Sequence, residues 1–244
     1  MLRNCIFILL LICSLYSCAV YSPGKPNPVS TELNLNRKYL GEIPDEVFDN
    51  KQLKVLRLYQ NKLISIPARI GELENLEELY IGKNQLTHLP PEIGRLKKLK
   101  ILSVQYNRLS DLPEEIGELE NLEQLILNQN YLKTLPSAIG KLSKLSKIQL
   151  NYNEITSLPE AFYNCTQLQF VQLNRNDLES ISPGIGQLKQ LRELSLVQAG
   201  RLLQLPEELC GLRLLELLEV DQMVVVPSCA LVNRTNRLQI RFHY

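Results

Sequence analysis

The sequence repeats itself every 23 residues, and this period constrains the fold more than any other feature. Six consecutive units begin at Leu53, Leu76, Leu99, Leu122, Leu145 and Leu168. Each follows L-x-x-L-x-L-x-x-N-x-L-x-x-L-P-x-x-I-G-x-L-x-x with small departures. A weaker unit precedes them from Ser30, a 24-residue unit with an insertion near Gly200 follows from Leu191, and a degenerate unit begins at Leu215. Because one such unit is too small to bury its own apolar face, the units must stack.

The position of each fixed residue predicts its role in a stacked unit. The L-x-x-L-x-L segment alternates at its centre, which indicates a short strand with leucines facing inward and the residues between them facing out. Identical strands from successive units then pair as a parallel sheet. A proline column should stop strand pairing on the return side, and a glycine column should permit a tight convex bend. These columns are Pro44, Pro67, Pro90, Pro113, Pro136 and Pro159, and Gly71, Gly94, Gly117, Gly140 and Gly186.

The most specific column is asparagine. A buried amide offers donors and an acceptor, so it can satisfy backbone groups where each strand turns out of the sheet. We therefore predict a structural ladder inside the stack, without a catalytic role, formed by Asn61, Asn84, Asn107, Asn130, Asn153 and Asn176.

These columns together are identified as the leucine-rich repeat, and the L-P-x-x-I-G-x-L half resembles bacterial sets such as those abundant in spirochaete leucine-rich-repeat lipoproteins. The resemblance implies an α/β-type repeat solenoid, or horseshoe, with a parallel β-sheet on the concave face and short helical, 3-10 or extended segments on the convex face. About eight repeats would occupy residues 30–214, and a degenerate last repeat with a C-terminal cap would occupy residues 215–244. The resemblance also implies partners among host or cell-surface proteins.

Residues 1–17 have the features of a signal peptide. One Arg precedes an apolar run of twelve residues at positions 5–16, which suits a secretory signal and is too short to span a membrane. Residues 15–18, LYSC, resemble a lipobox that would lipidate Cys18, although Tyr16 stands where a small residue is usual. Ordinary cleavage after Ala19 is the alternative.

Residues 18–29 contain three prolines and no core-forming period, so we expect a tether, which favours the lipid anchor. The protein would then be exported and held at the cell envelope by lipid, with secretion as the alternative.

Cysteine placement and motifs narrow the chemistry. Cys210 and Cys229 could form a disulfide that staples the last unit in an oxidising compartment, but sequence spacing alone leaves open whether the sulfurs meet. We find no C-x-x-C pair, Cys/His cluster, phosphate-binding Gly loop, G-x-S-x-G or H-E-x-x-H motif, so we expect no metal, no cofactor and no enzymatic activity. The formal net charge of +1 gives no basic excess for nucleic acid, and no small-molecule substrate is indicated.

The outward residues of the strands vary from unit to unit while the framework stays fixed, as expected of a scaffold that carries specificity. Tyr gives contact area with one polar group, and Arg gives a planar set of donors. We predict a monomeric protein-binding module whose concave face binds through Arg57, Tyr59, Tyr80, Lys83, Tyr106, Gln129, Gln149, Tyr152 and Arg175. Two alternatives remain: a hydrophilic face that is simply solvated, and a structural or self-associating envelope protein.

Overall fold

The computed structural model describes residues 30–231 and 238–244. The predicted signal peptide (1–17), the tether (18–29) and Cys18 lie outside the described residues. The described residues form a single sheet of ten parallel strands, paired in chain order: β1 (Glu32–Asn34), β2 (Val55–Arg57), β3 (Glu78–Tyr80), β4 (Ile101–Ser103), β5 (Gln124–Ile126), β6 (Lys147–Gln149), β7 (Phe170–Gln172), β8 (Glu193–Leu196), β9 (Leu217–Asp221) and β10 (Gln239–His243). The predicted parallel solenoid is confirmed, and each repeat is one coil, numbered from coil 1 at Ser30.

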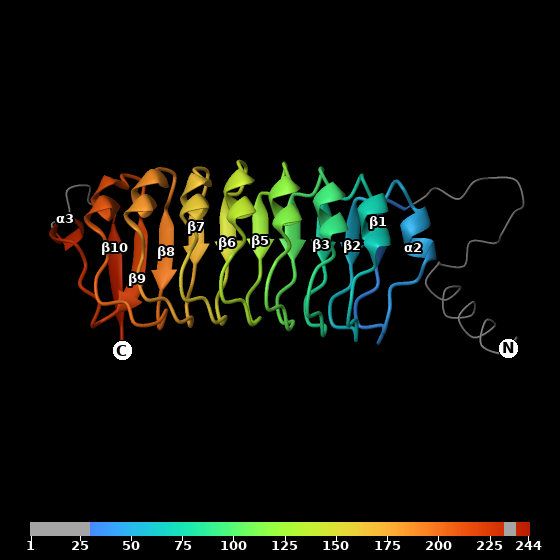
Figure 1. Cartoon of the computed structure of the whole chain (residues 1–244), viewed down its shortest axis with the longest axis horizontal. Coiled ribbons are helices and arrows are strands. Elements are labelled where there is room, and N and C mark those ends of the chain that lie inside the picture. Colours follow the sequence, from blue (N-terminus) through green and yellow to red (C-terminus); the bar gives the residue numbers. More distant parts are fainter. Residues whose placement is uncertain (1–29, 232–237) are drawn as a thin grey trace, which may run out of the picture.

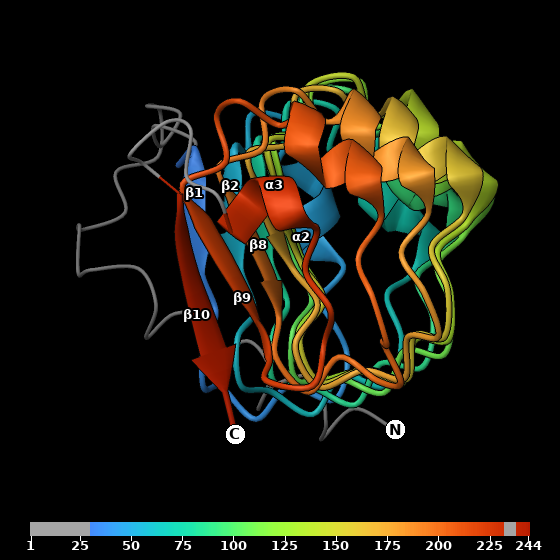
Figure 2. The same ribbon diagram turned by 90° about the vertical axis from the view of Figure 1, so that its left-hand side faces the viewer.

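The helical elements lie opposite the sheet (Figures 1 and 2). Two are single α-turns, α2 (Glu46–Asp49) and α3 (Ser228–Leu231), and the others are 3-10 helices: η1 (Ala68–Glu72), η2 (Pro91–Arg95), η3 (Glu114–Glu118), η4 (Ser137–Lys141), η5 (Glu160–Asn164), η6 (Pro183–Gln187) and η7 (Glu207–Gly211). Except before η6, which Ser182 caps, an extended proline precedes each 3-10 helix, such as Pro67 with ψ 154° before η1. Proline suits this position because its fixed φ and missing N–H end strand pairing.

The core runs along the whole stack between the sheet and the helices. Pattern leucines such as Leu56, Leu79 and Leu102 are fully buried, and they stack on one another from coil to coil. Phe48 of α2, also fully buried, closes the first coil. No helix within residues 30–231 or 238–244 is long and apolar enough to cross a bilayer.

The glycine column has a different cause from the predicted bend. Its members keep ordinary negative φ values, since Gly200 is the only described glycine with positive φ. What requires glycine is the next coil: a Cβ on Gly71 would lie 2.8 Å from the carbonyl oxygen of Glu92, and one on Gly94 would lie 2.6 Å from that of Glu115. The column therefore lets neighbouring 3-10 helices pack with their backbones in contact.

Coil 6 reverses this arrangement. Tyr163 stands in the glycine column and is only 1% exposed, with its ring edge-on to Phe162 at 5.5 Å between centroids. The residue that it meets in the next coil is Gly184, where an added Cβ would lie 2.6 Å from Cδ2 of Tyr163. In this pair of coils the large side chain therefore comes from the first coil and the glycine from the second, and the two coils still pack in contact.

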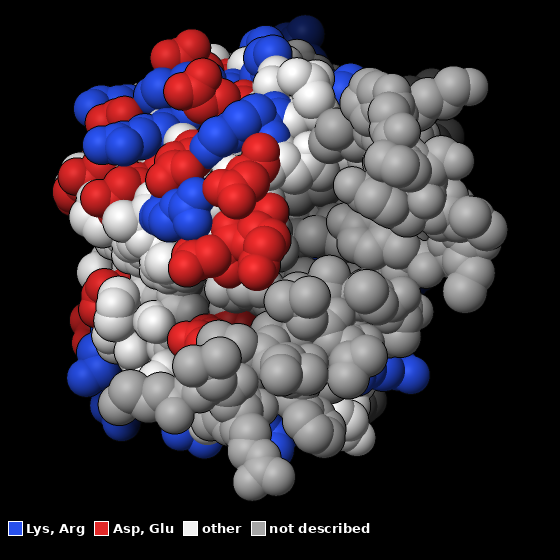
Figure 3. Space-filling view, turned by 90° about the vertical axis from the view of Figure 1, so that its right-hand side faces the viewer, with Lys and Arg blue, Asp and Glu red and all other residues white. Residues whose placement is uncertain are grey.

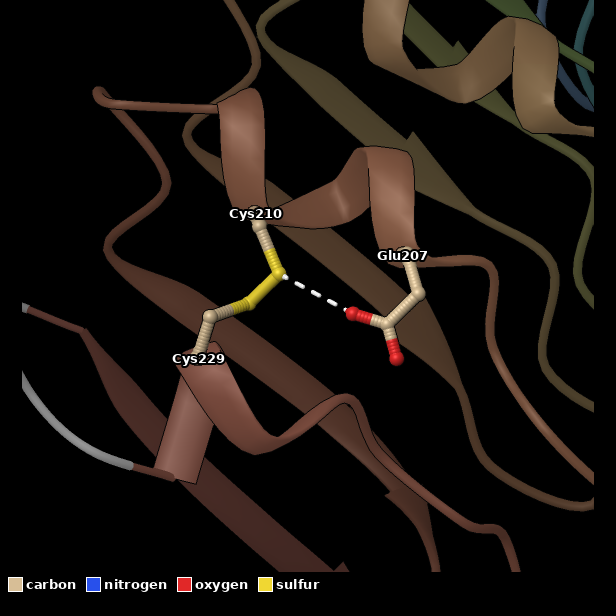
Figure 4. Close-up of a disulfide and its surroundings, with 3 residues drawn as sticks. All are labelled: Glu207, Cys210 and Cys229. Carbon is tan, nitrogen blue, oxygen red and sulfur yellow. Dashed lines mark hydrogen bonds between the residues drawn. A yellow bond between two sulfur atoms is a disulfide. The ribbon is translucent and has the colours of Figure 1, made fainter.

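The C-terminal end is closed by a strand and a disulfide. β10 pairs with β9 over five residues, so the C-terminal segment adds a closing strand to the sheet. Cys210 of η7 is bonded to Cys229 of α3, with their Cα atoms 5.8 Å apart (Figure 4). This link fixes the last helical turn to the coil before it.

Candidate functional site

The outward side chains of the ten strands, together with the outward residue just beyond each strand (such as Tyr59 after β2), form what we call the sheet face, which carries four of the predicted binding residues. Arg57 is half-buried between two acids, with its Nη1 3.0 Å from Oε2 of Glu32 and its Nη2 3.9 Å from Oε2 of Glu78. The guanidinium also lies over the ring of Tyr80, 5.6 Å from its centroid. Tyr80 donates its hydroxyl to Glu78 at 2.9 Å, and burial, followed by that carboxylate, raises the pKa of Tyr80.

The other two predicted residues of the sheet face are also held by neighbours. Gln149 donates to the side-chain oxygen of Gln172 at 2.6 Å, and Gln172 donates to Glu193 at 2.8 Å, which makes a polar chain across three strands. The ring of Tyr59 lies beside Gly82, where an added Cβ would be 3.0 Å from its Cδ2. These side chains are therefore preorganised, and part of their bonding capacity is already used.

One outward column was missed by the sequence prediction. It consists of the first residue of each strand from β2 to β9, which are in register with one another: Val55, Glu78, Ile101, Gln124, Lys147, Phe170, Glu193 and Leu217. The signal was available, because the period of two that runs forward from the buried leucine also runs backward from it. This column adds apolar area to the sheet face.

The other five predicted residues, Lys83, Tyr106, Gln129, Tyr152 and Arg175, are not on strands. They belong to the column directly before the ladder asparagine, where every residue is left-handed, with φ between 53° and 59°: Arg37, Gln60, Lys83, Tyr106, Gln129, Tyr152, Arg175 and Gln198. This column and the residue after each asparagine form what we call the turn rim, the edge along which the strands end. The sequence pattern predicted that this column belongs to the strands, whereas in the structure it lies just after them.

The left-handed turn is compatible with the hydrogen bonds between coils. The amide of Tyr106 donates to the carbonyl of Asn128, and that of Tyr152 donates to the carbonyl of Asn174, both at 2.8 Å. Their side chains remain exposed, at 43% for Tyr106 and 45% for Tyr152. The Arg175 guanidinium covers one face of the Tyr152 ring, 4.8 Å from its centroid.

The ladder asparagines are structural, as their contacts show. The Nδ2 of Asn107 donates to the carbonyls of Ile81 and Val104 at 3.1 and 3.0 Å, and its Oδ1 accepts from the amide of Leu86 at 3.0 Å. Each Oδ1 thus supports the turn of the coil before it. The same pattern recurs at Asn61, Asn84, Asn130, Asn153 and Asn176.

A second set of asparagines, at the end of the sheet face, also serves the framework. The Oδ1 atoms of Asn128, Asn151 and Asn174 each accept from the backbone amide 23 residues later, at 2.7–2.9 Å. Asn36 does the same for Tyr59 at 2.7 Å. These side-chain amides lie on the solvent-facing side of the sheet, but their oxygens are already used in hydrogen bonds between coils.

The three cysteines of the described residues have no free, accessible thiol in this state. Within the described part of the chain, the one group of three potential metal ligands is Glu207, Cys210 and Cys229, and its two sulfurs are bonded to each other (Figure 4). Cys165 is fully buried and donates to the carbonyl of Ile139 at 3.1 Å. Burial raises the pKa of its thiol to about 12, so it stays protonated at neutral pH.

Comparisons with known proteins agree with this architecture. A family model described as "Leucine-rich repeat region" matches residues 33–125 and 91–201. No curated protein sequence matches the chain. A leucine-rich-repeat protein of Leptospira interrogans is 32% identical, with a TM-score of 0.79 over 87% of this chain and 60% of that one.

Two further solved structures are similar. An internalin from Listeria monocytogenes has a TM-score of 0.74 and 20% identity over 87% of this chain and 61% of that one, which shows the shared fold alone. The plant peptide hormone receptor RGFR1, solved in complex with RGF2, has a TM-score of 0.61 and 29% identity over 82% of this chain and 37% of that one. The chain therefore covers less than two thirds of the length of each of these three proteins.

Proposed function

Because the chain belongs to the leucine-rich-repeat family, we propose that it is a non-enzymatic recognition module that binds a protein ligand across the sheet face and the turn rim. RGFR1 was solved in complex with RGF2 on the same kind of scaffold, which supports a protein or peptide as the ligand class. In this proposal the module acts as a monomer.

The observation that carries the proposal is the choice of residues at the left-handed positions of the rim. Glycine and asparagine adopt positive φ most readily, and other residues meet a steric cost of about 1–2 kcal/mol. All eight positions of this column nevertheless carry Tyr, Gln, Lys or Arg. The turn requires the backbone conformation but none of these side chains. Residues that are costly for the backbone and directed to solvent are expected where the side chain itself is used.

The rim also has the composition of a binding surface. Tyrosine and arginine are enriched among the residues that dominate binding energies, because they combine rigid contact area with polar groups. Tyr106 and Tyr152 project from coils 4 and 6, and Arg175 holds the Tyr152 ring from one side. The half-buried, preorganised polar side chains of the sheet face lie beside them and lower the entropic cost of docking.

Photo-crosslinking identifies the ligand and its position together. A benzophenone amino acid replaces Tyr106 in the full chain, and, as the matched control, Glu118 at the end of η3 on the opposite side. We expect a defined protein adduct from position 106 and none from position 118. Adducts from 118 alone would place the interface on the helical side and refute the proposal.

Affinity for the identified ligand is then measured with Tyr106→Gly and Tyr152→Gly. Glycine removes each side chain while it accepts the left-handed backbone, so thermal unfolding should not worsen. Truncation of an anchor tyrosine costs about 2 kcal/mol, so we expect a loss of affinity of about thirtyfold for each. Unchanged affinity in both variants would exclude the rim as the binding surface.

We also propose that the protein is exported and anchored at the cell envelope through lipid on Cys18. Support comes from the apolar run at residues 5–16 and the lipobox-like residues 15–18. Cys18→Ala should abolish fatty-acid labelling and partitioning into the detergent phase. Labelling that is the same in the native protein and in Cys18→Ala would rule out the anchor. A native protein that is exported but carries no fatty-acid label would favour ordinary cleavage.

A further inference from the structure

The rim of coils 1–5 has cations but no acid. Its charged members are Arg37, Lys62, Lys83 and Arg108, and Lys38 lies next to Arg37 in the asparagine position of coil 1. All five are exposed. The ion pairs found within residues 30–231 and 238–244 include none of them. Some lysines near the helices differ, since Lys51 pairs with Glu72 at 2.7 Å and Lys97 pairs with Glu118 at 3.0 Å.

Figure 3 shows the contrast at the N-terminal end. Acidic and basic side chains lie close together over the helical side, and basic side chains predominate among the coloured ones along the lower edge. On the helical side acids lie among the cations and pair with several of them, whereas the rim of coils 1–5 has positive charge without acids of its own, which is available to a partner.

Tyrosines stand between these cations. Tyr39 is 78% exposed, Tyr131 is 53% exposed, and Tyr106 lies between them on coil 4. The Nζ of Lys62 lies over the Tyr39 ring, 5.6 Å from its centroid. A surface of cations and aromatic rings can bind both the carboxylates and the apolar parts of a ligand.

The acid-free stretch has a definite end. In the column of Tyr39, Lys62, Arg108 and Tyr131, coils 6 and 7 carry Glu154 and Asp177, both exposed. A long, uniformly charged polyanion that continued along the rim would meet these carboxylates and be repelled. A short acidic segment would end before them, and its continuation could offer a basic group to them.

The length of the stretch fits a short peptide. Parallel strands lie about 4.8 Å apart, so coils 1–5 extend over about 19 Å along the rim. An extended chain rises about 3.3 Å per residue, so about six residues of a ligand would lie against this stretch.

We propose that the turn rim of coils 1–5 binds an extended acidic segment of the protein ligand, with its carboxylates on Lys62, Lys83 and Arg108 and its apolar atoms on Tyr39, Tyr106 and Tyr131. This inference rests on the proposed function and specifies the chemistry of the partner. Glu154 and Asp177 limit the acidic segment to that end of the rim and set its direction.

The test uses a fluorescein-labelled peptide of alternating glutamate and threonine, with the glutamine-for-glutamate peptide as its control. Fluorescence anisotropy with the full chain at low ionic strength should show binding of the acidic peptide alone, and binding should weaken as salt is added. The triple variant Lys62→Glu, Lys83→Glu, Arg108→Glu should weaken binding by at least about tenfold. Absence of binding to the acidic peptide would overturn the inference.

The matched control is Lys98→Glu, Lys141→Glu, Lys189→Glu, which makes the same change of net charge on residues of the helical side or next to it. This variant should keep its affinity within about twofold. An equal loss in both triple variants would mean attraction by net charge only and would refute the site.

Two further measurements separate related outcomes. Heparin or single-stranded DNA that binds more tightly than the peptide and depends on the same three cations would make the rim a polyanion site, contrary to the inference. Glu154→Lys with Asp177→Lys should extend binding to longer acidic peptides, and no gain would contradict the proposed boundary. Failure here leaves the crosslinking result at position 106 unaffected, so the two proposals can fail independently.

Discussion

The exchange of bulk between Tyr163 and Gly184 allows a double-mutant test of how the coils stack. In other coils a glycine faces a larger residue of the next coil, as Gly140 faces Ala161. Replacing Tyr163 by Gly and Gly184 by Ala would restore that ordinary pairing. We expect each single change to destabilise the protein and the second change to offset part of the cost of the first.

The magnitudes follow from the contacts. Tyr163→Gly removes a ring that is 1% exposed and the hydroxyl that accepts from the amide of Ser182 at 3.2 Å, so about 3–5 kcal/mol should be lost. Gly184→Ala alone places a Cβ 2.6 Å from Cδ2 of Tyr163, about 0.8 Å closer than ordinary contact, and such overpacking costs about 1–3 kcal/mol. With the ring absent this second cost disappears, so the double variant should be less destabilised than the sum by about 1–3 kcal/mol.

Urea unfolding followed by circular dichroism gives the four free energies of the cycle, with the slope checked for each variant because repeat stacks can lose cooperativity. The control is Gly117→Ala, whose Cβ would lie 2.7 Å from that of Ala138 in a different pair of coils. Its cost should add to that of Tyr163→Gly without coupling. Additivity within about 0.5 kcal/mol for the Tyr163 and Gly184 pair would refute the packing argument.

Three other outcomes are expected. Asn107→Ala leaves three backbone groups of two coils without their buried partner, so urea unfolding should show a loss of about 2–5 kcal/mol, and a loss below about 1 kcal/mol would contradict the ladder. Replacing Cys210 and Cys229 by Ser opens a loop with a sequence separation of 19, which should cost about 3 kcal/mol and expose the C-terminal strand to limited proteolysis first; unchanged protection would argue against the staple. Hydrogen bonds, chiefly from Arg69, lower the pKa of Glu72 from 4.5 to about 2, so the stabilisation by this carboxylate is complete above about pH 4.5 and is lost as the pH falls through 2. Glu72→Gln should therefore flatten the pH dependence of the melting temperature over that window. A pH dependence equal to that of the native protein would exclude this contribution.

The framework of this protein is readable from sequence because each framework residue has one chemical reason for its identity. Leucine supplies apolar bulk every two or three positions, asparagine supplies both donors and an acceptor, and proline cannot extend a strand. The glycine column was also visible, but its cause was not. Its role depends on the distance between a glycine of one coil and a carbonyl of the next, such as Gly94 and Glu115, and no single repeat contains that distance.

The candidate site was only partly readable for a related reason. Sequence patterns reveal a left-handed residue when it is glycine or asparagine, and here the column carries Tyr, Gln, Lys and Arg, which have no such signature. Its position between the last strand leucine and the asparagine therefore looked like strand. The partners of Arg57 were equally hidden, since Glu32 and Glu78 come from the coils on either side.

The asparagine ladder ends one coil before the left-handed column of the rim, at Asn176 and Gln198 respectively. Each ladder asparagine supports the turn of the coil before it, so Asn176 supports the turn of coil 6 through the amide of Ile155. Coil 8 has Ala199 in place of asparagine, and the turn of coil 7 is held instead by the bond from the amide of Leu178 to the carbonyl of Ala199 at 2.7 Å. The inserted Gly200, with φ 137°, lies against the Leu178 backbone in a conformation that side chains rarely adopt. The left-handed turns at Arg175 and Gln198 therefore form without a ladder asparagine in the following coil, and the inserted Gly200 is where the regular 23-residue spacing of the rim ends.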